Sequence, residues 1–366
     1  MTAKPRKHLT YFYCLIVILI IAVGAARSAA AQATSAGTID SITVHGASLV
    51  GNLIGDSPDR HVTVYLPPSY RSQPNRHYPV VYMLHGFTDS DLKWFGGPGG
   101  WMNLKAVADE SMSSGASKEM ILVVPNANNA FHGSFYSSSV TIGDWEGFIA
   151  RDLVSYIDQH YRTIARPESR GLAGHSMGGY GTVRIGLERS DVFSSIYALS
   201  PCCLEPMNGM ANPQLKTSAE KIRTLNDVDK ADFYTLLVFS IAAAWSPDPK
   251  NPPLYLDLPF GDTAPSQLVL QKWIANAPMI RIDQSIPDLK RLHAIAFDAG
   301  AKDEFKAIPA SLVILDRELS AYGIAHTYET YDGTHTNGIA KRIGHNVLPF
   351  FSKNLSFEES IASSKP

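Results

Sequence analysis

Short, unbroken apolar segments that alternate with helical segments are the feature that most constrains the fold of this 366-residue chain. Such segments are typical of strands that are buried on both faces, as in a parallel sheet covered by helices on both sides. The sequence therefore predicts an α/β fold with a mostly parallel central sheet. The expected strands are Pro79–Leu84, Met120–Val124, Gly171–Gly174, Phe193–Leu199, Leu292–Phe297 and His326–Tyr331.

Two stretches near the start of the chain have a different pattern. Ile42–Ile54 and Val62–Leu66 alternate apolar and polar residues, which is typical of half-buried strands, and we expect them to form an opening antiparallel pair. Helices are expected where apolar residues recur every three or four positions, at Phe148–Tyr161, Phe305–Tyr322 and Ile339–Leu355. One domain over residues 34–366 is the simplest account of these elements.

An unusually long interval separates the strand that ends near Ser200 from the strand that begins near Leu292. One helix would suffice for a crossover of this kind, so we expect an insertion at about residues 201–291, before the penultimate strand. It contains an apolar run, Phe233–Trp245, that is too short to cross a bilayer. The insertion is expected to cover an acyl pocket as a cap or to offer a surface to a partner.

The first 33 residues have the pattern of an export signal. A basic start is followed by an apolar run over 11–26 and by the small residues Ala31-Gln32-Ala33. We expect cleavage after Ala33, a periplasmic or secreted product, and no membrane span in that product, because the apolar run is shorter than the roughly 20 residues of a spanning helix. The chain carries a net charge of −2, and the segment to be removed is basic, so the remainder is acidic. An acidic chain is not built to bind nucleic acid.

The hexapeptide Gly174-His175-Ser176-Met177-Gly178-Gly179 contains the pattern G-x-S-x-G. It follows the short strand 171–173 and precedes an expected helix over 180–189, which is the strand–turn–helix context of a nucleophile elbow. Glycines are needed two residues before and two residues after the serine, because side chains there would collide with neighbouring backbone. Ser176 would then lie exposed at a helix N-terminus, where free N–H groups favour a developing anion.

A serine nucleophile needs a histidine base and a carboxylate, which follow in this fold in the order serine, acid, histidine. The expected strand ending at Phe297 precedes three carboxylates. We favour Asp303 as the acid, with Asp298 as the alternative. Asp298 ends the strand and would cap the turn, whereas Glu304 begins the next helix and would interact with its dipole.

The loop between the last expected strand and the last expected helix contains His335, the position that a base requires. His345 lies within that helix and His326 begins the strand, so both are expected to be structural. The oxyanion hole needs two backbone N–H groups, one from Met177 and one from Phe87 in the loop after the strand 80–84.

Other motifs leave alternatives open. Trp94 and Trp101 flank a glycine-rich loop and are expected either to form walls of the substrate pocket or simply to pack. The adjacent residues Cys202 and Cys203 form either a thiol pair or a strained disulfide. No histidine pair has metal-ligand spacing, so neither a metal nor another cofactor is expected.

Together these motifs resemble the esterase branch of the α/β-hydrolases, which includes esterase D, feruloyl and acetylxylan esterases, enterochelin esterases and mycolyltransferases. The resemblance covers roughly residues 40–353 and includes Val80–Gly86, Val123–Asn126, Gly133–Tyr136, Gly174–Gly179, Gly300–Asp303, Gly333–His335 and Leu348–Phe351. It implies an α/β-hydrolase fold, with Ser176 as nucleophile, Asp303 as acid and His335 as base. It also implies Phe87 and Met177 as oxyanion donors. The long insertion departs from the pattern of the smaller esterases.

The expected function is that of an exported serine hydrolase of carboxylic esters, which acts through an acyl-enzyme on a small-molecule, carbohydrate or lipid ester. An acyltransferase of the mycolyltransferase type is the first alternative, because it would use the same three residues. A non-catalytic binding module that retains the fold is the second.

Overall fold

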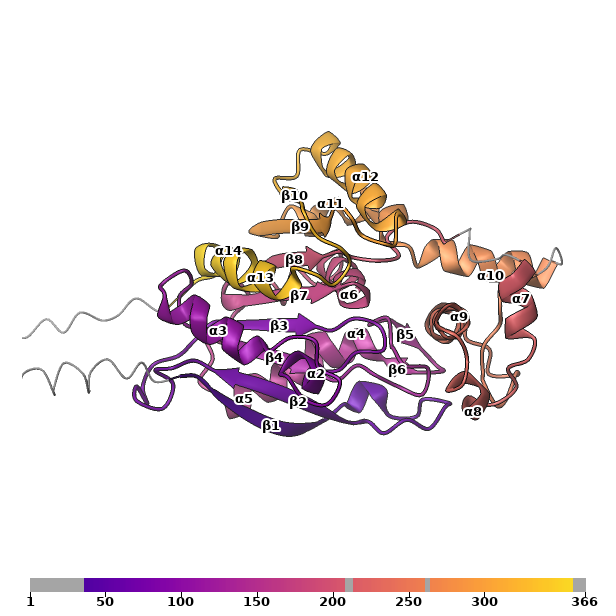
Figure 1. Ribbon diagram of the computed structural model, residues 1–366, viewed down its shortest axis with the longest axis horizontal. Coiled ribbons are helices and arrows are strands. Elements are labelled where there is room, and N and C mark those ends of the chain that lie inside the picture. Colours follow the sequence, from indigo (N-terminus) through magenta and orange to yellow (C-terminus); the bar gives the residue numbers. More distant parts are fainter. Residues whose placement is uncertain (1–35, 208–212, 261–263, 358–366) are drawn as a thin grey trace, which may run out of the picture. The chain divides into compact units, whose positions relative to one another are not determined.

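The computed structural model describes residues 36–207, 213–260 and 264–357, and the expected export signal over residues 1–33 lies outside them. The described chain is built around an eight-stranded sheet with the strand order β1-β2-β4-β3-β7-β8-β9-β10 (Figure 1). The strands are β1 (Thr38–His45), β2 (Asp59–Leu66), β3 (Val80–Leu84), β4 (Ile121–Pro125), β7 (Arg170–His175), β8 (Ser195–Leu199), β9 (Ala294–Gly300) and β10 (Thr327–Tyr331), with a separate small pair β5 (Ser138–Ser139) and β6 (Gly143–Asp144).

The sheet is parallel from β4 to β10, and β1 and β2 are antiparallel at one edge. This confirms the predicted mostly parallel sheet and the opening antiparallel pair. The prediction that one strand continues from residue 42 to residue 54 is wrong, because β1 ends at His45 and Ala47–Leu49 forms a 3-10 turn, η1. Beyond it, the amides of Leu53 and Ile54 bond to carbonyls of residues 140 and 141.

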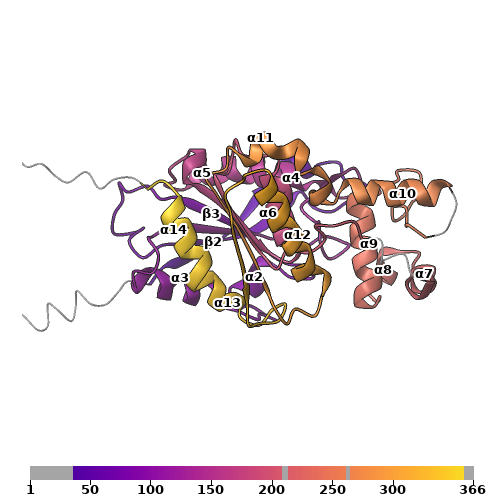
Figure 2. The same cartoon turned by 90° about the horizontal axis from the view of Figure 1, so that it is seen from above.

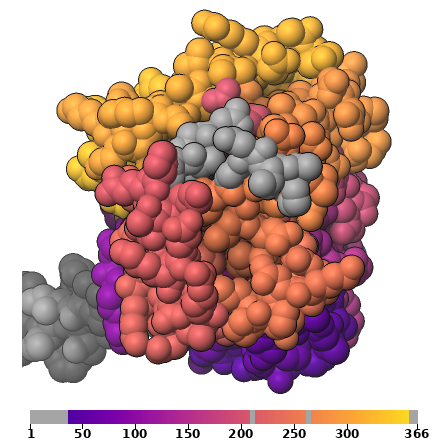
Figure 3. Space-filling model, turned by 90° about the vertical axis from the view of Figure 1, so that its right-hand side faces the viewer, coloured from indigo at the N-terminus to yellow at the C-terminus, as the bar shows by residue number. Residues whose placement is uncertain are grey.

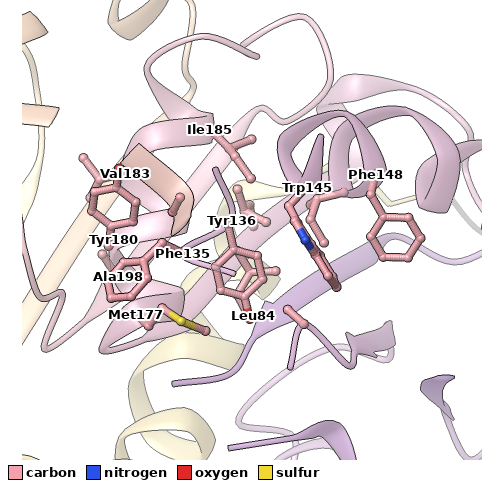
Figure 4. Close-up of a cluster of buried hydrophobic side chains, with 14 of the residues drawn as sticks. Leu84, Phe135, Tyr136, Trp145, Phe148, Met177, Tyr180, Val183, Ile185 and Ala198 are labelled. Atoms are coloured by element: carbon pink, nitrogen blue, oxygen red, sulfur yellow. The ribbon is translucent and has the colours of Figure 1, made fainter. Parts of the chain in front are cut away.

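Helices cover both faces of the sheet, as predicted (Figures 1 and 2). On one face, α3 (Leu104–Ser113) and the C-terminal helix pack in an apolar cluster with alternate residues of the strands. On the other face, the remaining residues of the same strands pack against α6 (Met177–Gly186), α12 (Ala307–Ala321) and the helix that begins at Trp145. Figure 4 shows part of this second cluster, in which Trp145, Phe135 and Tyr180 lie beside Leu84 and Met177.

Two of the expected helices contain a π-helical turn that apolar spacing did not reveal. The first helix consists of α4 (Trp145–Gly147), the π-turn η2 (Phe148–Leu153) and α5 (Val154–His160). The last consists of α13 (Ile339–Arg342), the π-turn η7 (Ile343–Val347) and α14 (Leu348–Asn354). In the last helix Pro349 follows the π-turn, and proline has no N–H to continue an α-helical ladder.

The insertion lies between β8 and the penultimate strand β9, and Figure 3 looks onto the end of the molecule that it forms. Its apolar run forms α9 (Phe233–Trp245), which is buried along most of its length. Within the described ranges, no helix is long and apolar enough to cross a membrane. The remaining helices are α2 (Asp91–Trp94), α7 (Pro213–Ala219), α8 (Leu225–Val228), α10 (Ala264–Ala275) and α11 (Ile286–Leu289), with 3-10 turns η3 (Pro167–Ser169), η5 (Pro278–Arg281) and η6 (Asp283–Ser285).

Candidate active site

The turn between β7 and α6 holds Ser176 in a backbone conformation that side chains rarely adopt, with φ 57° and ψ −115°. Only glycine fits two residues before it and two residues after it. A Cβ on Gly174 would lie 2.3 Å from the carbonyl oxygen of Gly178, and a Cβ on Gly178 would lie 2.0 Å from the carbonyl oxygen of Leu84. The turn therefore presents the serine at the first turn of α6 at the cost of backbone strain, which is of order 1–3 kcal/mol at such positions.

Three side chains from distant parts of the sequence form a hydrogen-bonded chain. His335 Nε2 lies 2.9 Å from Ser176 Oγ, and His335 Nδ1 lies 2.8 Å from Asp303 Oδ2. Ser176 follows β7, Asp303 follows β9 and His335 follows β10, so all three lie beyond the carboxyl ends of parallel strands. In this arrangement the Asp303 carboxylate accepts the Nδ1–H of His335, which leaves Nε2 free to accept the proton of the serine hydroxyl.

The structure separates the two aspartates that the sequence left as candidates for the acid. Asp303 is completely buried, and its other oxygen accepts the amide N–H of Phe305 at 2.9 Å. Asp298 does not reach His335 and does not cap a turn. It accepts hydrogen bonds from Tyr197 and Arg342, and burial raises the pKa of its carboxyl. Asp298 is thus part of a buried ion pair behind the site.

Glu304 was expected to interact with the dipole of the following helix, and this prediction is wrong. The helix α12 begins three residues later, and the Glu304 carboxylate instead accepts the backbone N–H of His335 at 3.0 Å. This hydrogen bond is the largest cause of the lowered pKa of Glu304. Glu304 therefore fixes the backbone of the histidine loop, while Asp303 fixes its side chain.

The two backbone groups expected to bind an oxyanion lie next to Ser176. Met177 is the first residue of α6, where N–H groups have no intrahelical partner. Gly86, which precedes Phe87, lies against the serine, because a Cβ on it would be 3.4 Å from Ser176 Cβ. Gly133 lies between the side chains of Phe87 and Met177, since a Cβ there would be 2.7 Å from each of them. Gly133 therefore lets this loop pack close to the side chains of both donor residues.

His175, the first variable residue of the G-x-S-x-G motif, has a role that the sequence did not reveal. Its Nε2–H donates to the backbone carbonyl of His335 at 2.8 Å, and the two rings lie 4.8 Å apart. Burial, followed by the charge that His335 can carry, lowers the pKa of His175 to about 3. His175 therefore remains a neutral donor that holds the loop of His335.

A cavity of about 570 Å³ opens at Ser176 and His335. The core supplies Phe87 and Phe135 to its wall, and α9 of the insertion supplies Phe233, Tyr234 and Leu237. The aromatic rings are in contact: the ring centroids of Phe87 and Phe233 are 5.7 Å apart, and those of Phe233 and Phe305 are 6.0 Å apart. One side of the cavity is therefore an apolar aromatic pocket that the core and the insertion build together.

Hydrogen bonds attach α9 firmly to the core loop beside the oxyanion donors. The hydroxyl of Ser240 donates to the carbonyl of Gly133 at 2.7 Å, and both groups are buried. The hydroxyl of Ser139 donates to the carbonyl of Ala243 at 2.7 Å, and the indole N–H of Trp245 donates to Ser137 Oγ at 3.3 Å. These bonds hold this wall of the cavity in place.

Of the two tryptophans expected to form substrate walls, the structure places only Trp101 at the cavity. Trp101 is 37% exposed and lines the cavity, whereas Trp94 is completely buried beneath it and does not line it. The reason is the buried carboxylate of Asp89, which accepts both indole N–H groups, from Trp94 at 2.7 Å and from Trp101 at 2.9 Å. Asp89 was not singled out from the sequence, because no spacing pattern marks it.

The adjacent cysteines also line this cavity, and both thiols are free. In the described parts of the chain, no group of three or more histidine, cysteine or acidic residues could hold a metal ion. The geometry at Ser176 thus consists of a hydroxyl, an imidazole, a carboxylate and two backbone amides around one cavity.

Comparison with known proteins places the chain among the esterases. The model of the Esterase family, described as "Putative esterase", matches residues 57–338. The chain belongs to the Esterase family. An esterase of Mycobacterium tuberculosis is 28% identical over 211 residues, which are 52% of this chain and 44% of that protein. An endo-1,4-beta-xylanase/feruloyl esterase of Xylanibacter ruminicola is 30% identical over 136 residues, which are 36% of this chain and 18% of that protein. The match therefore spans less than half the length of these curated relatives.

Solved structures confirm the α/β-hydrolase fold predicted from the resemblance. A ferulic acid esterase superposes with a TM-score of 0.60 at 22% identity, over 87% of this chain and 99% of that chain. An S-formylglutathione hydrolase of Staphylococcus aureus superposes with a TM-score of 0.57 at 16% identity, over 86% of this chain and 99% of that chain. At these identities the likeness establishes the fold alone.

Proposed function

We propose that this member of the Esterase family hydrolyses carboxylic esters with Ser176 as the nucleophile. The observation that carries the proposal is the position of His335, which lies within hydrogen-bonding distance of both Ser176 Oγ and the buried Asp303. A serine is inert as a nucleophile without such a base, and the base needs an orienting acid. Membership of the family supports ester hydrolysis as the reaction.

In the proposed reaction the ester carbonyl lies over Ser176, and His335 Nε2 takes the hydroxyl proton as Oγ bonds to the carbonyl carbon. The amides of Met177 and Phe87 stabilise the oxyanion, and each such donor is typically worth about 3–4 kcal/mol of barrier. His335 then gives its proton to the departing alcohol. Water, deprotonated by the same imidazole, attacks the acyl-enzyme and releases the acid. Asp303 remains a carboxylate and holds the imidazole in the productive tautomer.

The proposed acyl group is apolar and aromatic. The rings of Phe87, Phe135, Phe233 and Phe305 surround one side of the cavity, and aromatic rings favour edge-to-face or offset contacts with another ring. The names of a relative and of a superposed structure, a feruloyl esterase and a ferulic acid esterase, support such a group. Trp101, on the wall next to His175, is proposed to contact the alcohol.

The test uses a serine-directed fluorophosphonate, because it reports the nucleophile without a chosen substrate. After trypsin digestion, the label is expected on the peptide of residues 171–184, at Ser176. His335→Ala should abolish labelling, whereas His345→Ala, which changes an exposed histidine of the last helix, should not. Folded protein that takes up no label would refute the proposal and favour a non-catalytic binding module.

The acyl preference is tested on the unlabelled enzyme with a matched series of esters of one alcohol. Hydrolysis of the aryl-substituted acyl ester is expected to have a higher kcat/KM than hydrolysis of the acetyl ester. Phe233→Ala should reduce this preference by about three- to tenfold, because a bound acyl group would bury the 43% of this side chain that is exposed, and full burial is worth about 1.5–3 kcal/mol. Val313→Ala, on the exposed face of α12, is the control and should leave the preference unchanged. An unchanged preference in Phe233→Ala would refute the assignment of this ring to the acyl pocket.

We also propose that residues 1–33 direct export and are removed after Ala33. The basic start, the apolar run and the Ala31-Gln32-Ala33 pattern support this proposal. The 366-residue chain, expressed in an exporting host, should yield a product whose intact mass corresponds to a chain that begins at Thr34. A product that retains residue 1 in the cell fraction would contradict it.

A further inference from the structure

Cys202 and Cys203 are held side by side in a way that an ordinary chain does not adopt. Successive side chains of an extended segment point in opposite directions. Here Cys203 has a φ of +61°, in the left-handed region that non-glycine residues rarely occupy, and the Sγ atoms of the two cysteines are in direct contact. A strained residue of this kind persists only where its surroundings enforce it, and such residues cluster at functional sites.

The pair is open to small reagents through the cavity. Both cysteines line the same cavity as Ser176, and both are half-buried. They are the free cysteines of the described chain, and the third cysteine of the sequence, Cys14, lies within the expected export signal. A reagent that enters the cavity therefore meets two thiols that can react with each other.

The same segment is bonded to the nucleophile. The amide N–H of Cys202 donates to the backbone carbonyl of Ser176 at 3.1 Å. Pro201 packs against the first turn of α6, because a Cβ on Gly179 would lie 2.7 Å from Pro201 Cα. A change in the backbone at residues 202 and 203 would therefore move Ser176 and the turn of α6 that supplies the Met177 amide, because both are in direct contact with this segment.

We propose that Cys202 and Cys203 form a dithiol modification site that a small disulfide oxidant converts to a vicinal disulfide, which slows acylation of Ser176. Formation of the disulfide depends on the two thiols alone, whereas its effect on the acylation of Ser176 rests on the proposed function. The oxidant is a low-molecular-weight disulfide such as glutathione disulfide.

The oxidation takes place in two thiol–disulfide exchanges. The Cys202 thiolate attacks one sulfur of the oxidant, whose other sulfur leaves as a thiolate. Cys203 then loses its proton and attacks Cys202 Sγ, which releases the second thiol. Two electrons and two protons pass in total from the protein to the reagent. Burial and the adjacent Cys202 raise the pKa of Cys203, so Cys202 is the first attacking group and Cys203 the resolving one.

Ring closure changes the backbone because the cysteines are neighbours. Neighbouring Cα atoms across a trans peptide are about 3.8 Å apart, whereas a disulfide normally joins Cα atoms about 4.4–6.8 Å apart. The peptide between Cys202 and Cys203 must therefore rotate or bend to close the ring. The hydrogen bond from the Cys202 amide to the Ser176 carbonyl is the contact that this rotation would weaken most. Acylation of Ser176 is expected to slow by about five- to tenfold, the scale of one lost hydrogen bond.

The test equilibrates the folded protein in mixtures of glutathione and glutathione disulfide, alkylates free thiols and digests with trypsin. Both cysteines lie on one peptide, residues 190–216. Under oxidising conditions this peptide should be about 2 Da lighter than the reduced peptide and carry no alkyl group, and under reducing conditions it should carry two. In parallel, the rate of fluorophosphonate labelling at Ser176 should fall under oxidising conditions and recover with dithiothreitol.

The variants Cys202→Ser, Cys203→Ser and the double variant are the controls, and each is compared only with itself under the two conditions. The labelling rate of the double variant should be equal in the oxidised and reduced buffers, and a single variant should trap a glutathione adduct in place of the disulfide. Wild-type peptide that keeps two alkyl groups, or carries only glutathione, in every buffer would overturn the dithiol site. A disulfide that leaves the labelling rate unchanged would overturn its effect on Ser176. If Ser176 takes no label in either buffer, the proposed function fails, while the peptide mass still decides whether the disulfide forms.

Discussion

The buried histidine beside the nucleophile makes a measurable contribution to the dependence of stability on pH. His175 has a pKa of about 3 in the folded chain against an ordinary value of 6.5, because burial and the charge of His335 oppose its protonation. Between these values the unfolded chain binds a proton at this residue and the folded chain does not, so stability rises with pH in this window. The contribution is complete above pH 6.5 and is lost as the pH falls towards 3. Between pH 7 and pH 5 it amounts to about 2 kcal/mol.

The test is His175→Gln, because glutamine does not titrate and its amide can donate where Nε2–H donated to the His335 carbonyl. Urea unfolding at pH 7 and at pH 5 gives the free energy of unfolding of each protein. The wild type should lose about 2 kcal/mol more than His175→Gln between the two pH values, by linkage at this single group. His345→Gln, at an exposed position, is the matched control and should behave as the wild type. Equal losses in the wild type and His175→Gln would refute the assignment of a neutral, buried donor.

Three further substitutions test the site. Asp303→Asn should leave the fold intact and reduce kcat by about 10³–10⁴-fold in ester hydrolysis, because an amide cannot hold the productive imidazole tautomer; a loss below tenfold would contradict the assignment. Asp89→Ala should leave the indole N–H of Trp101 without its acceptor and raise KM more than it lowers kcat. An unchanged KM would show that the hydrogen bond from Trp101 to Asp89 does not contribute to substrate binding. Gly178→Ala should lower the free energy of unfolding by about 3 kcal/mol or more in urea unfolding, since its Cβ would lie 2.0 Å from a backbone oxygen. Gly344→Ala is the control and should lower the free energy of unfolding far less, because the nearest neighbour of its Cβ is a side chain at 3.2 Å.

The parts of the fold that depend on local pattern were predictable. Unbroken apolar runs at β3 and β4 predict strands buried on both faces, and the two apolar clusters show why, since neighbouring residues of each strand pack in different layers. The order of residues along the chain then places Ser176, Asp303 and His335 at one edge of the sheet, because parallel strands end at the same edge. Sequence position also favoured Asp303 over Asp298, but it could not reveal the partner of Asp298, which depends on where Arg342 lies.

The parts that depend on contacts between distant segments were not predictable. No spacing pattern reveals that Asp89 is buried with the indole N–H groups of both tryptophans, which is why Trp94 was expected at the pocket and lies beneath it. The hydrogen bond that Glu304 accepts from the backbone N–H of His335 likewise joins segments 31 residues apart. The π-helical turns escape apolar spacing, because one extra residue per turn shifts the apolar face only slightly.

The groups of the proposed reaction and the residues that line the acyl side of the cavity come from different parts of the chain. All five groups of the proposed reaction come from loops and turns of the central sheet, whereas α9 of the insertion supplies Phe233, Tyr234 and Leu237 to the wall. The buried bond from Ser240 ties α9 to Gly133, which packs against Phe87 and Met177. Because this anchor lies about two turns along α9 from Phe233 and Tyr234, substitutions in the first turn of the helix can reshape the pocket while the anchor and the hydrogen-bonded chain at Ser176 stay in place. We therefore propose that the first turn of α9 selects the acyl group, so that substitutions in that turn change the acyl preference and leave the reacting groups in place.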